Sequence, residues 1–286
     1  RTEVFKNYFK LKIKASNDLK QLFLKHLEEE RLSYDRLDIF STPRRLGLII
    51  WGLADKSASF SEEKRGPRVG APSSALDGFA KSVNAEVSSL YSKKEKKGEF
   101  YFYRLNHPGS ESGELIKKIT WNIIHNFPWK KSMRWGSGSF RWVRPLRSIL
   151  FNLYRVKSEP TLIELDLNGL KSSSYTFGHA TMDSEKFYPK SALDYVSGLE
   201  ARHVILDYKL REKIIWEASK QLITGKNSEL IKDDFLLSEI AGLVEWPEVL
   251  LGAIDKEFLT LPKEILQVTM REHQKFFSIM NIENGL

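Results

Sequence analysis

The stretch RLDIFSTPRRLGLIIWGL, residues 36–53, sets the pattern from which the fold can be worked out. Its two apolar halves flank Ser41-Thr42-Pro43, and these residue types favour turns, so the stretch predicts two strands joined by a turn. Residues 5–32 precede it with apolar side chains at helical spacing, which predicts a helix. The fold is therefore expected to begin with a helix followed by a strand pair.

Further along the chain, helical and strand patterns are intermixed without the regular alternation of βαβ units. This favours fold class α+β, a mixture of strands and helices. We expect a strand-rich domain over residues 1–183, followed by a more helical part over residues 184–286. The predicted elements include strands at 99–105, 149–154, 161–167 and 276–280, and helices at 115–127, 209–223 and 263–273.

Composition limits the chemistry that the chain can perform. Its 286 residues include no cysteine, which excludes disulfides, thiol catalysis and thiolate metal ligands. The longest apolar run, residues 46–54, is far shorter than the ~20 residues that span a bilayer. We therefore expect no membrane partner and a cytoplasmic protein. Because the sequence begins at Arg1 without an initiator methionine, we also expect a fragment of a longer chain.

A basic window lies between Glu114 and Glu159, with ten cations and no carboxylate in a chain of net charge +8. It also holds four of the seven tryptophans, and its densest part is PWKKSMRWGSGSFRWVRPLR, residues 128–147. Concentrated positive charge attracts polyanions, and aromatic faces can stack on bases. The alternative is a solvated basic face on a loop anchored by its aromatic residues. The candidate RNA-binding residues are Lys130, Lys131, Arg134, Trp135, Arg141 and Arg144, with Trp129 as a further candidate.

Two other segments carry cations at positions of interest. Arg44 and Arg45 enter the second strand of residues 36–53, and in a strand they would point to opposite faces. They are candidates for contact with RNA or a protein partner, and the alternative is edge-strand protection by charge. The segment MREHQKFF, which starts at Met270, adds candidates, and its alternative is a helix–strand junction. In a strand, three polar residues would share one face: Arg271, His273 and Lys275.

Motifs for catalysis are missing from the sequence. It has no phosphate-binding GxxxxGK[ST] loop, no GxGxxG and no GxSxG. The six histidines show no ligand spacing, so we expect no metal site. No catalytic residue is assigned.

Nine short segments follow one another in a fixed order: TPRRL at Thr42, GP at Gly66, GFAK at Gly78, PWKKSMRWG at Pro128, WVRPLRSI at Trp142, TFGHA at Thr176, LVEWPEVLLGAID at Leu243, FLTLPKEIL at Phe258 and MREHQKFF at Met270. Together they resemble the N-terminal part of the β subunit of the bacterial-type, two-subunit glycyl-tRNA synthetase. The resemblance runs from about residue 40 to the C-terminal end. Each segment is weakly specific alone, but nine in order make coincidence improbable.

The resemblance implies a glycine–tRNA ligase, which charges tRNA(Gly) with glycine using ATP and Mg²⁺. The family's enzyme contains two α and two β subunits. It implies that the adenylate site, with ATP and Mg²⁺, is on α, and that β supplies most of the tRNA binding. The N-terminal region of β is similar in fold to the tRNA-handling and editing module of the phenylalanyl-tRNA synthetase β subunit. The family's HD-like and anticodon-binding regions would lie beyond residue 286, and this stretch alone is expected to be inactive.

Three functional hypotheses stay open at this point. The leading one is a tRNA-binding and assembly part of glycine–tRNA ligase. A second is hydrolytic editing of mischarged tRNA, although the small size of glycine lets a site exclude larger amino acids sterically. A third makes the basic window a docking surface for the α subunit, since tryptophan and arginine are favoured anchors in protein interfaces.

Overall fold

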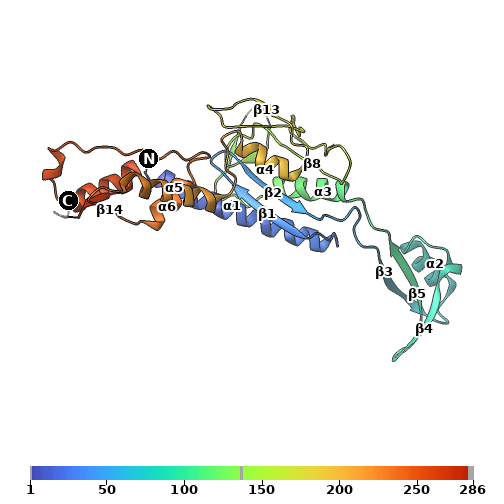
Figure 1. Cartoon of the computed structure of the whole chain (residues 1–286). Helices are drawn as coiled ribbons and strands as arrows, with labels where there is room; N and C mark the ends of the chain where they lie inside the picture. Colours follow the sequence, from blue (N-terminus) through green and yellow to red (C-terminus); the bar gives the residue numbers. More distant parts are fainter. Residues whose placement is uncertain (1, 136–137, 283–286) are drawn as a thin grey trace. The chain divides into compact units, whose positions relative to one another are not determined.

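A computed structural model of the chain describes residues 2–135 and 138–282 (Figure 1). In this part of the chain, helices are interspersed with antiparallel sheets of two or three strands, and no larger sheet forms. The α+β fold class predicted from the sequence is therefore confirmed. The likeness to the phenylalanyl-tRNA synthetase module stays a prediction.

The helices are α1 (Thr2–Glu29), α2 (Ser73–Ser82), α3 (Ser112–His125), α4 (Ala192–Glu200), α5 (Tyr208–Ile223), α6 (Asp234–Ala241) and α7 (Lys263–Val268), with the single turns η1 (Val87–Ser89), η2 (Phe258–Thr260) and η3 (Thr269–Gln274). The strands are β1 (Arg36–Ser41), β2 (Leu46–Trp51), β3 (Phe60–Arg68), β4 (Tyr91–Glu95), β5 (Gly98–His107), β6 (Met133–Arg134), β7 (Arg141–Trp142), β8 (Asn152–Leu153), β9 (Thr161–Leu162), β10 (Asp166–Leu167), β11 (Leu170–Lys171), β12 (Thr176–Phe177), β13 (Lys186–Phe187), β14 (Ser228–Leu230) and β15 (Ile279–Asn281).

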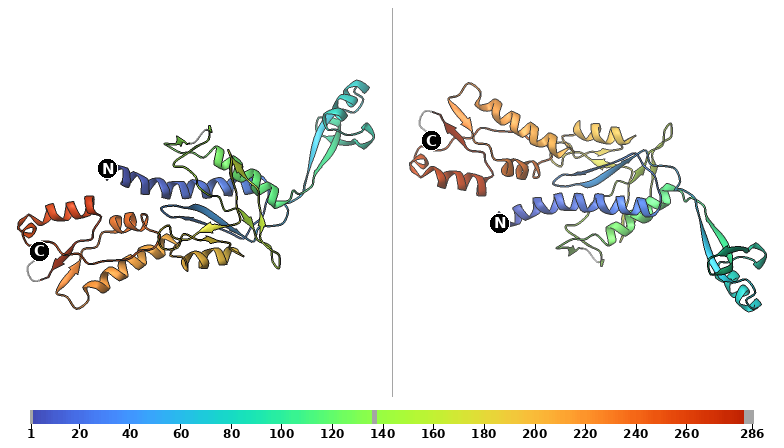
Figure 2. Two further views of the ribbon diagram at one scale, coloured as in Figure 1. Left: turned by 90° about the horizontal axis from the view of Figure 1, so that it is seen from above. Right: turned by 90° about the horizontal axis from the view of Figure 1, so that it is seen from below.

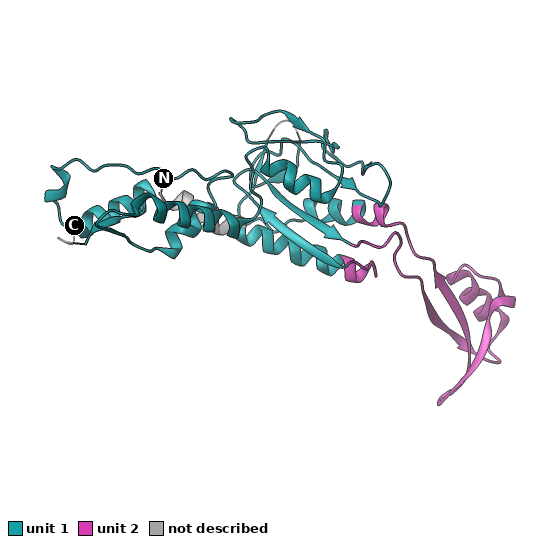
Figure 3. Ribbon diagram, in the orientation of Figure 1, with its two compact units in different colours: residues 1–26, 35–51, 117–286 teal, residues 27–34, 52–116 magenta. Residues whose placement is uncertain are grey.

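The chain divides into two compact units (Figure 3). The larger, unit 1, consists of residues 1–26, 35–51 and 117–286, and the smaller, unit 2, of residues 27–34 and 52–116. Unit 2 is therefore inserted into the sequence of unit 1. The domains predicted at 1–183 and 184–286 stay a prediction.

Unit 2 is built on a three-stranded antiparallel sheet in the order β3-β5-β4, with α2 packed near β3. The ring of Phe79 on α2 lies so close to Gly66 on β3 that a Cβ there would come within 2.4 Å of it. Only glycine at this position lets helix and strand approach to this distance. The register of β3 shifts beside this glycine, between Arg65 and Arg68, and a bulge of this kind bends a strand.

Unit 1 begins with α1 and the β1–β2 hairpin, which lie side by side in every view (Figures 1 and 2). In the hairpin, Leu37 lies opposite Ile50 and Ser41 lies opposite Leu46. The buried face of α1 includes Ala15, Leu19 and Phe23, spaced by four residues as an amphipathic helix requires. The helix and strand pair predicted at the start of the chain are therefore confirmed.

A second core of unit 1 forms where α4 leads into α5. Leu199, Val204 and Leu206 are buried there, and Phe40 of β1 and Tyr195 of α4 pack against them. The Asp207 side chain caps α5 by accepting from the N–H groups of Lys209 and Leu210, the second and third residues of the helix, as an N-cap does. This core brings the end of β1 next to the start of α5.

Some predicted strands are shorter or displaced. Strands were predicted at 149–154 and 161–167, but the paired strands in these ranges are only two residues long: β8 in the first, and β9 and β10 in the second. The strand predicted at 276–280 begins three residues later, as β15. The reason is that the π-helical turn η3 ends at Lys275 in the left-handed conformation, with φ of 61°. The N–H of Phe276 then bonds back to the Met270 carbonyl, so this residue still belongs to the helix end.

Candidate nucleic-acid interface

Residues 128–147, the densest part of the basic window, form what we call the basic hairpin. Its strands are β6 and β7, in which Met133 lies opposite Trp142 and Arg134 lies opposite Arg141. The connection between the strands includes residues 136 and 137, which lie outside the described residues. The two directly opposed arginines repel each other, so the hairpin depends on its aromatic side chains for stability.

A cluster of aromatic rings supports the basic hairpin. Trp142 is buried, and its ring centroid lies 5.2 Å from that of Phe127, 4.8 Å from that of Trp129 and 6.0 Å from that of Phe140. Trp135 is half-buried and contacts Phe140 edge-on at 5.4 Å. Trp129 and Trp142 are therefore packing residues, whereas Trp135 lies at the margin of the cluster.

The cations of the basic hairpin face solvent. Lys130, Lys131, Arg134 and Arg144 are exposed. The guanidinium of Arg141 donates to the hydroxyl and the carbonyl of Ser132, at 3.1 and 2.8 Å, which fixes its direction. No carboxylate within the described residues forms an ion pair with the four cations of β6, β7 and the preceding loop, namely Lys130, Lys131, Arg134 and Arg141.

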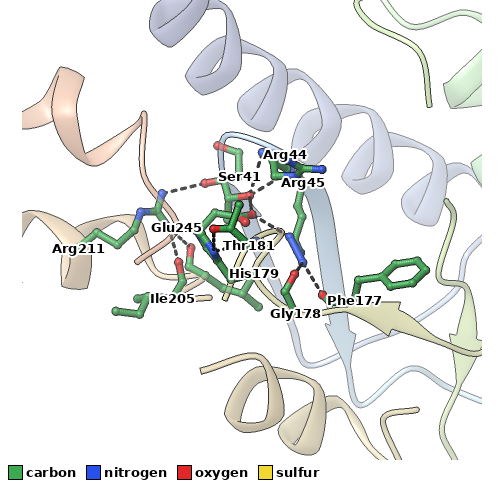
Figure 4. A network of polar contacts seen from close by, with 12 residues as sticks. Ser41, Arg44, Arg45, Phe177, Gly178, His179, Thr181, Ile205, Arg211 and Glu245 are labelled. Carbon is green, nitrogen blue, oxygen red and sulfur yellow. Dashed lines mark hydrogen bonds and ion pairs between the residues drawn. The ribbon is translucent and has the colours of Figure 1, made fainter. Parts of the chain in front are cut away.

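Arg44 and Arg45, adjacent in sequence, occupy different environments (Figure 4). Arg44 is exposed. The guanidinium of Arg45 lies 2.8 Å from Glu245 Oε1 and donates to the carbonyls of Phe177 and Gly178. The side chains of the pair are 14% and 2% exposed, so Arg45 is held inside the protein. Its predicted contact with RNA or a partner stays a prediction, but its guanidinium already has three acceptors.

Thr42 organises the turn that carries these arginines. Its hydroxyl accepts from the N–H groups of Arg44 and Arg45, at 3.2 and 3.0 Å, and donates to Glu245 Oε1. A threonine that bonds two following N–H groups stabilises a tight turn. The hydroxyl proton is then directed at the carboxylate, which also accepts from Arg45. We call the set of Thr42, Arg45, Glu245 and Arg211 the Glu245 network.

Arg211 is the part of the Glu245 network that sequence reasoning missed. It is fully buried, and its guanidinium donates to four backbone carbonyls: those of Ser41, Ile205, Leu206 and Ala241. Burial lowers the pKa of Arg211, and the negative charge of Glu245 opposes that shift. The one available signal was spacing, because Arg211, Ile215 and Ser219 recur every four residues on the buried face of α5.

The network joins segments that are far apart in the sequence. The Ile205 N–H donates to the Glu245 carbonyl at 2.9 Å, so the backbone of the LVEWP segment is tied to the start of α5. Through Thr42 and Arg45, the same glutamate is tied to the TPRRL turn and to the TFGHA segment. Three of the nine segments quoted above therefore meet in one buried set of contacts.

The cations of residues 271–275 are also paired. Arg271 lies 2.6 Å from Asp233, and Lys275 lies 2.8 Å from Glu239, whose side chain is 1% exposed. His273 is exposed. These residues occupy the π-helical turn and its left-handed end, so the strand alternation considered for them is wrong and the helix–strand junction is confirmed. Their side chains join η3 to the residues at the start and middle of α6.

The part of the chain that the structure describes contains neither a metal-binding cluster nor a membrane-spanning helix. Within residues 2–135 and 138–282, no three histidine, aspartate or glutamate side chains gather in a way that could hold a metal ion. Over the same ranges, none of the helices combines the length and the apolar character that crossing a membrane requires.

Comparison with known proteins places the chain in a family. The family model described as glycyl-tRNA synthetase beta subunit matches residues 10–286. The chain is 42% identical over 276 residues to a glycine–tRNA ligase beta subunit of Ruegeria sp., 41% identical to that of Paracoccus denitrificans and 37% identical to that of Dinoroseobacter shibae. Each match covers 96% of this chain, but 40%, 40% and 38% of the respective relative, so the chain spans about two fifths of the length of these relatives. On this evidence, the chain belongs to the glycyl-tRNA synthetase beta subunit family.

Proposed function

We propose that this chain is the tRNA-binding and assembly part of a glycine–tRNA ligase β subunit. The enzyme it serves would join glycine to tRNA(Gly) in the cytoplasm, using ATP and Mg²⁺ bound by the α subunit, in a complex of two α and two β subunits. The observation that carries the tRNA-binding role is the basic hairpin, in which Lys130, Lys131 and Arg134 are exposed, form no ion pair with a described carboxylate, and are carried on an aromatic cluster around the buried Trp142.

Phosphate groups are the ligand that this arrangement fits best. Cations that already pair with protein carboxylates gain little from a phosphate, whereas unpaired ones release the counterions condensed on the RNA and gain affinity. We assign phosphate contacts to Lys130, Lys131 and Arg134, and Arg144 stays a candidate because it is exposed in the same hairpin. Arg141 is directed by Ser132 and would present its remaining N–H donors. Contacts of this kind orient the RNA and do not read its sequence.

Trp135 has a different proposed role. It is the tryptophan of the hairpin that contacts the cluster only through the edge of Phe140 and is only half-buried. An indole held in this way can stack on an unpaired base, which contributes about 1–3 kcal/mol to affinity. Trp129 and Trp142 are packed among other rings and would act by holding the hairpin in place.

The test uses the full-length β subunit in complex with α and measures tRNA affinity over a salt series. In the triple variant Lys130→Gln, Lys131→Gln, Arg134→Gln, the slope of log affinity against log salt should flatten by about 0.7–0.9 per lost phosphate contact. The matched control neutralises three cations that already have carboxylate partners, Lys209, Lys220 and Lys232. It should leave the slope nearly unchanged.

A folded triple variant with the slope of the unmodified complex would overturn the assignment. Trp135→Ala in the same complex should lower affinity by about 1–3 kcal/mol without altering the slope, because stacking releases no counterions. A loss of α binding in either variant would instead make the hairpin the docking surface for α.

The assembly role rests on a second observation, an apolar surface near the end of the described chain. Residues 248–282 contribute no buried residue, yet their side chains include Leu250 at 87% exposed and Phe276 at 59%. Exposed apolar surface on this scale marks protein interfaces. Amide hydrogen exchange of full-length β with and without α should show protection of residues 248–282 when α binds. Unchanged exchange in this segment would remove the argument for α contact here.

A further inference from the structure

Unit 2 carries a second concentration of unpaired positive charge, at the end of the β4–β5 hairpin (Figure 1). We call it the lysine tip and define it as Arg68, Lys94, Lys96 and Lys97, all of which are exposed. Arg68 belongs to this end because it lies opposite Phe100, which also pairs with β4 at Lys93. Unlike the basic window, this segment is interrupted by carboxylates, so a search for unbroken runs of cations does not find it.

The carboxylates near the lysine tip are already engaged by other partners. Glu95 pairs with Arg65 at 3.2 Å, and Glu99 accepts from the Ser92 hydroxyl at 2.7 Å. None of the described carboxylates forms an ion pair with the four cations of the tip. Arg65 therefore neutralises Glu95, whereas Glu99, which lies opposite Lys94, keeps its charge, so the four cations of the tip outnumber the one carboxylate beside them that no cation neutralises.

Glu63 of β3 is a further carboxylate on the same sheet, and it lies at the centre of a cluster of hydrogen-bond donors. It accepts from Lys93 at 2.7 Å, from the Tyr91 hydroxyl at 2.7 Å and from Arg104 at 3.3 Å. These donors, Lys93 first, lower the pKa of Glu63 to about 2. The glutamate therefore stays charged at neutral pH and holds Lys93 and Arg104 on the sheet, away from any added ligand.

The strands hold the lysine tip on a stiff base. The Arg65 guanidinium stacks over the Phe100 ring at 3.7 Å, and Tyr91 stacks on the buried Phe102. At the turn, Gly98 has φ of 127°, and a Cβ there would come 2.9 Å from Arg68 Nε. Glycine is therefore required twice, for the backbone angle and for the path of the Arg68 side chain across the turn. A preorganised base lowers the entropy cost of binding.

We propose that the lysine tip is a second RNA contact, which binds the phosphate backbone of the same tRNA as the basic hairpin. The inference rests on the proposed function for the identity of the RNA. The four residues of the tip are exposed cations, and none of them is aromatic. Their chemistry therefore suits the phosphate groups along an RNA backbone better than an RNA base. Lysine, a flexible point charge, contacts phosphate without demanding a fixed geometry.

The test again uses the full-length β subunit in complex with α and measures tRNA affinity over a salt series. The variant Lys94→Gln, Lys96→Gln, Lys97→Gln should flatten the log–log salt slope by about 0.7–0.9 per lost contact, in addition to the effect of the basic-hairpin variant. The matched control replaces the same three lysines by arginine. It keeps the charge and should keep the slope. Gly98→Ala, which displaces Arg68 without changing charge, should weaken binding at low salt.

The possible results separate this inference from the proposed function. If the glutamine variant keeps the full slope while the basic-hairpin variant loses part of it, the lysine tip is not an RNA contact and the proposed function stands. If neither variant changes the slope, both proposals fail. If the glutamine variant binds tRNA normally but loses the α subunit, the tip is a protein contact and the inference is overturned. Ethylation interference on the tRNA should lose one group of protected phosphates in the lysine-tip variant and a different group in the basic-hairpin variant.

Discussion

The Glu245 network and the basic hairpin use arginine in opposite ways. In the network, Arg45 and Arg211 are enclosed, and their guanidinium groups donate to backbone carbonyls and, from Arg45, to a carboxylate. In the hairpin, Arg134 is exposed and lies opposite Arg141, another cation. The two regions differ because only the network receives acceptor groups, carboxylate and carbonyl oxygens, from segments distant in the sequence. Positive charge in a sequence therefore indicates an RNA surface only where no distant acceptor returns to neutralise it.

Arg44 and Arg45 show this most directly, because they are neighbours in the sequence and both were candidates for contact with RNA or a partner. Arg45 contacts Glu245, which lies 200 residues away, whereas Arg44 remains at the surface. A single turn can therefore direct one side chain into the interior and its neighbour to the surface. Mutations can test the comparison between the Glu245 network and the basic hairpin, and the expected losses in the free energy of unfolding differ in size.

The largest effect is expected for Arg211→Met. The change removes the arginine donor from four carbonyl oxygens, three of them in buried hydrogen bonds, each at a cost of about 1–3 kcal/mol, so we expect a loss of about 5 kcal/mol in the free energy of unfolding. Denaturant unfolding followed by tryptophan fluorescence measures it. The control is Lys209→Ala on the same helix, whose side chain is 79% exposed and which should change stability by less than about 0.5 kcal/mol. Equal effects of the two variants would show that the network does not stabilise unit 1.

The next effect is expected for Trp142→Ala in the basic hairpin. Removing a buried indole that touches three other rings should cost about 3–5 kcal/mol. Trp135→Ala should cost only about 1 kcal/mol, since its ring is half-buried and lies at the margin of the cluster, in a T-shaped contact with Phe140. Thermal or denaturant unfolding of both variants makes the comparison. A larger loss for Trp135 than for Trp142 would reverse their assigned roles.

A smaller effect is expected for Arg45→Met, about 2–3 kcal/mol, because it leaves Glu245 buried without its cation and the pair is slightly exposed. The double variant Arg45→Met, Glu245→Met should recover part of this loss, since a pair of apolar side chains leaves no buried charge. Arg44→Met serves as the neighbouring control and should be nearly neutral. A double variant less stable than Arg45→Met alone would contradict the ion-pair argument.

The smallest effect is expected for Arg134→Gln. It removes repulsion between opposed cations, so the free energy of unfolding should stay the same or rise by up to about 0.5 kcal/mol. Denaturant unfolding at low and high salt measures it, and any gain should shrink as salt screens the charges. A loss of more than about 1 kcal/mol would mean that Arg134 holds the hairpin together.

The parts of the fold that sequence predicted are those set by local patterns. The β1–β2 hairpin follows from its own apolar halves and its Thr42-Pro43 turn. The strand predicted at 276–280 was displaced because Lys275 ends η3 in a left-handed conformation. Lysine has no local preference for this conformation, so the sequence pattern does not predict it. The strands predicted at 149–154 and 161–167 contain only two-residue pairs, because the backbone there changes partner: the Phe151 N–H donates to the Ser173 carbonyl, and the Phe151 carbonyl accepts from the Ile163 N–H.

For the candidate site, the basic hairpin was visible in composition, because its cations and tryptophans are consecutive in the sequence. The Glu245 network was not, since Glu245 and Arg211 carry no signal of their partners in the residues around them. The pairing of Lys275 with Glu239 is similar, with 36 residues between them. The lysine tip was less visible for another reason: Glu95 and Glu99 offset part of its charge in a count along the sequence, and Arg68 is contributed by a distant segment.

The 200 residues between Arg45 and Glu245 also affect the order in which the chain matures on the ribosome. At a synthesis rate of ~5–20 residues per second, Arg45 is made roughly 10–40 s before its carboxylate. During that interval the TPRRL turn and β2 have been synthesised, but the Glu245 carboxylate that accepts from Arg45 has not. Unit 2 is complete by residue 116 and can fold first. Unit 1 must wait for its second half, so a nascent chain arrested before residue 245 should expose its β1–β2 hairpin to proteases and chaperones.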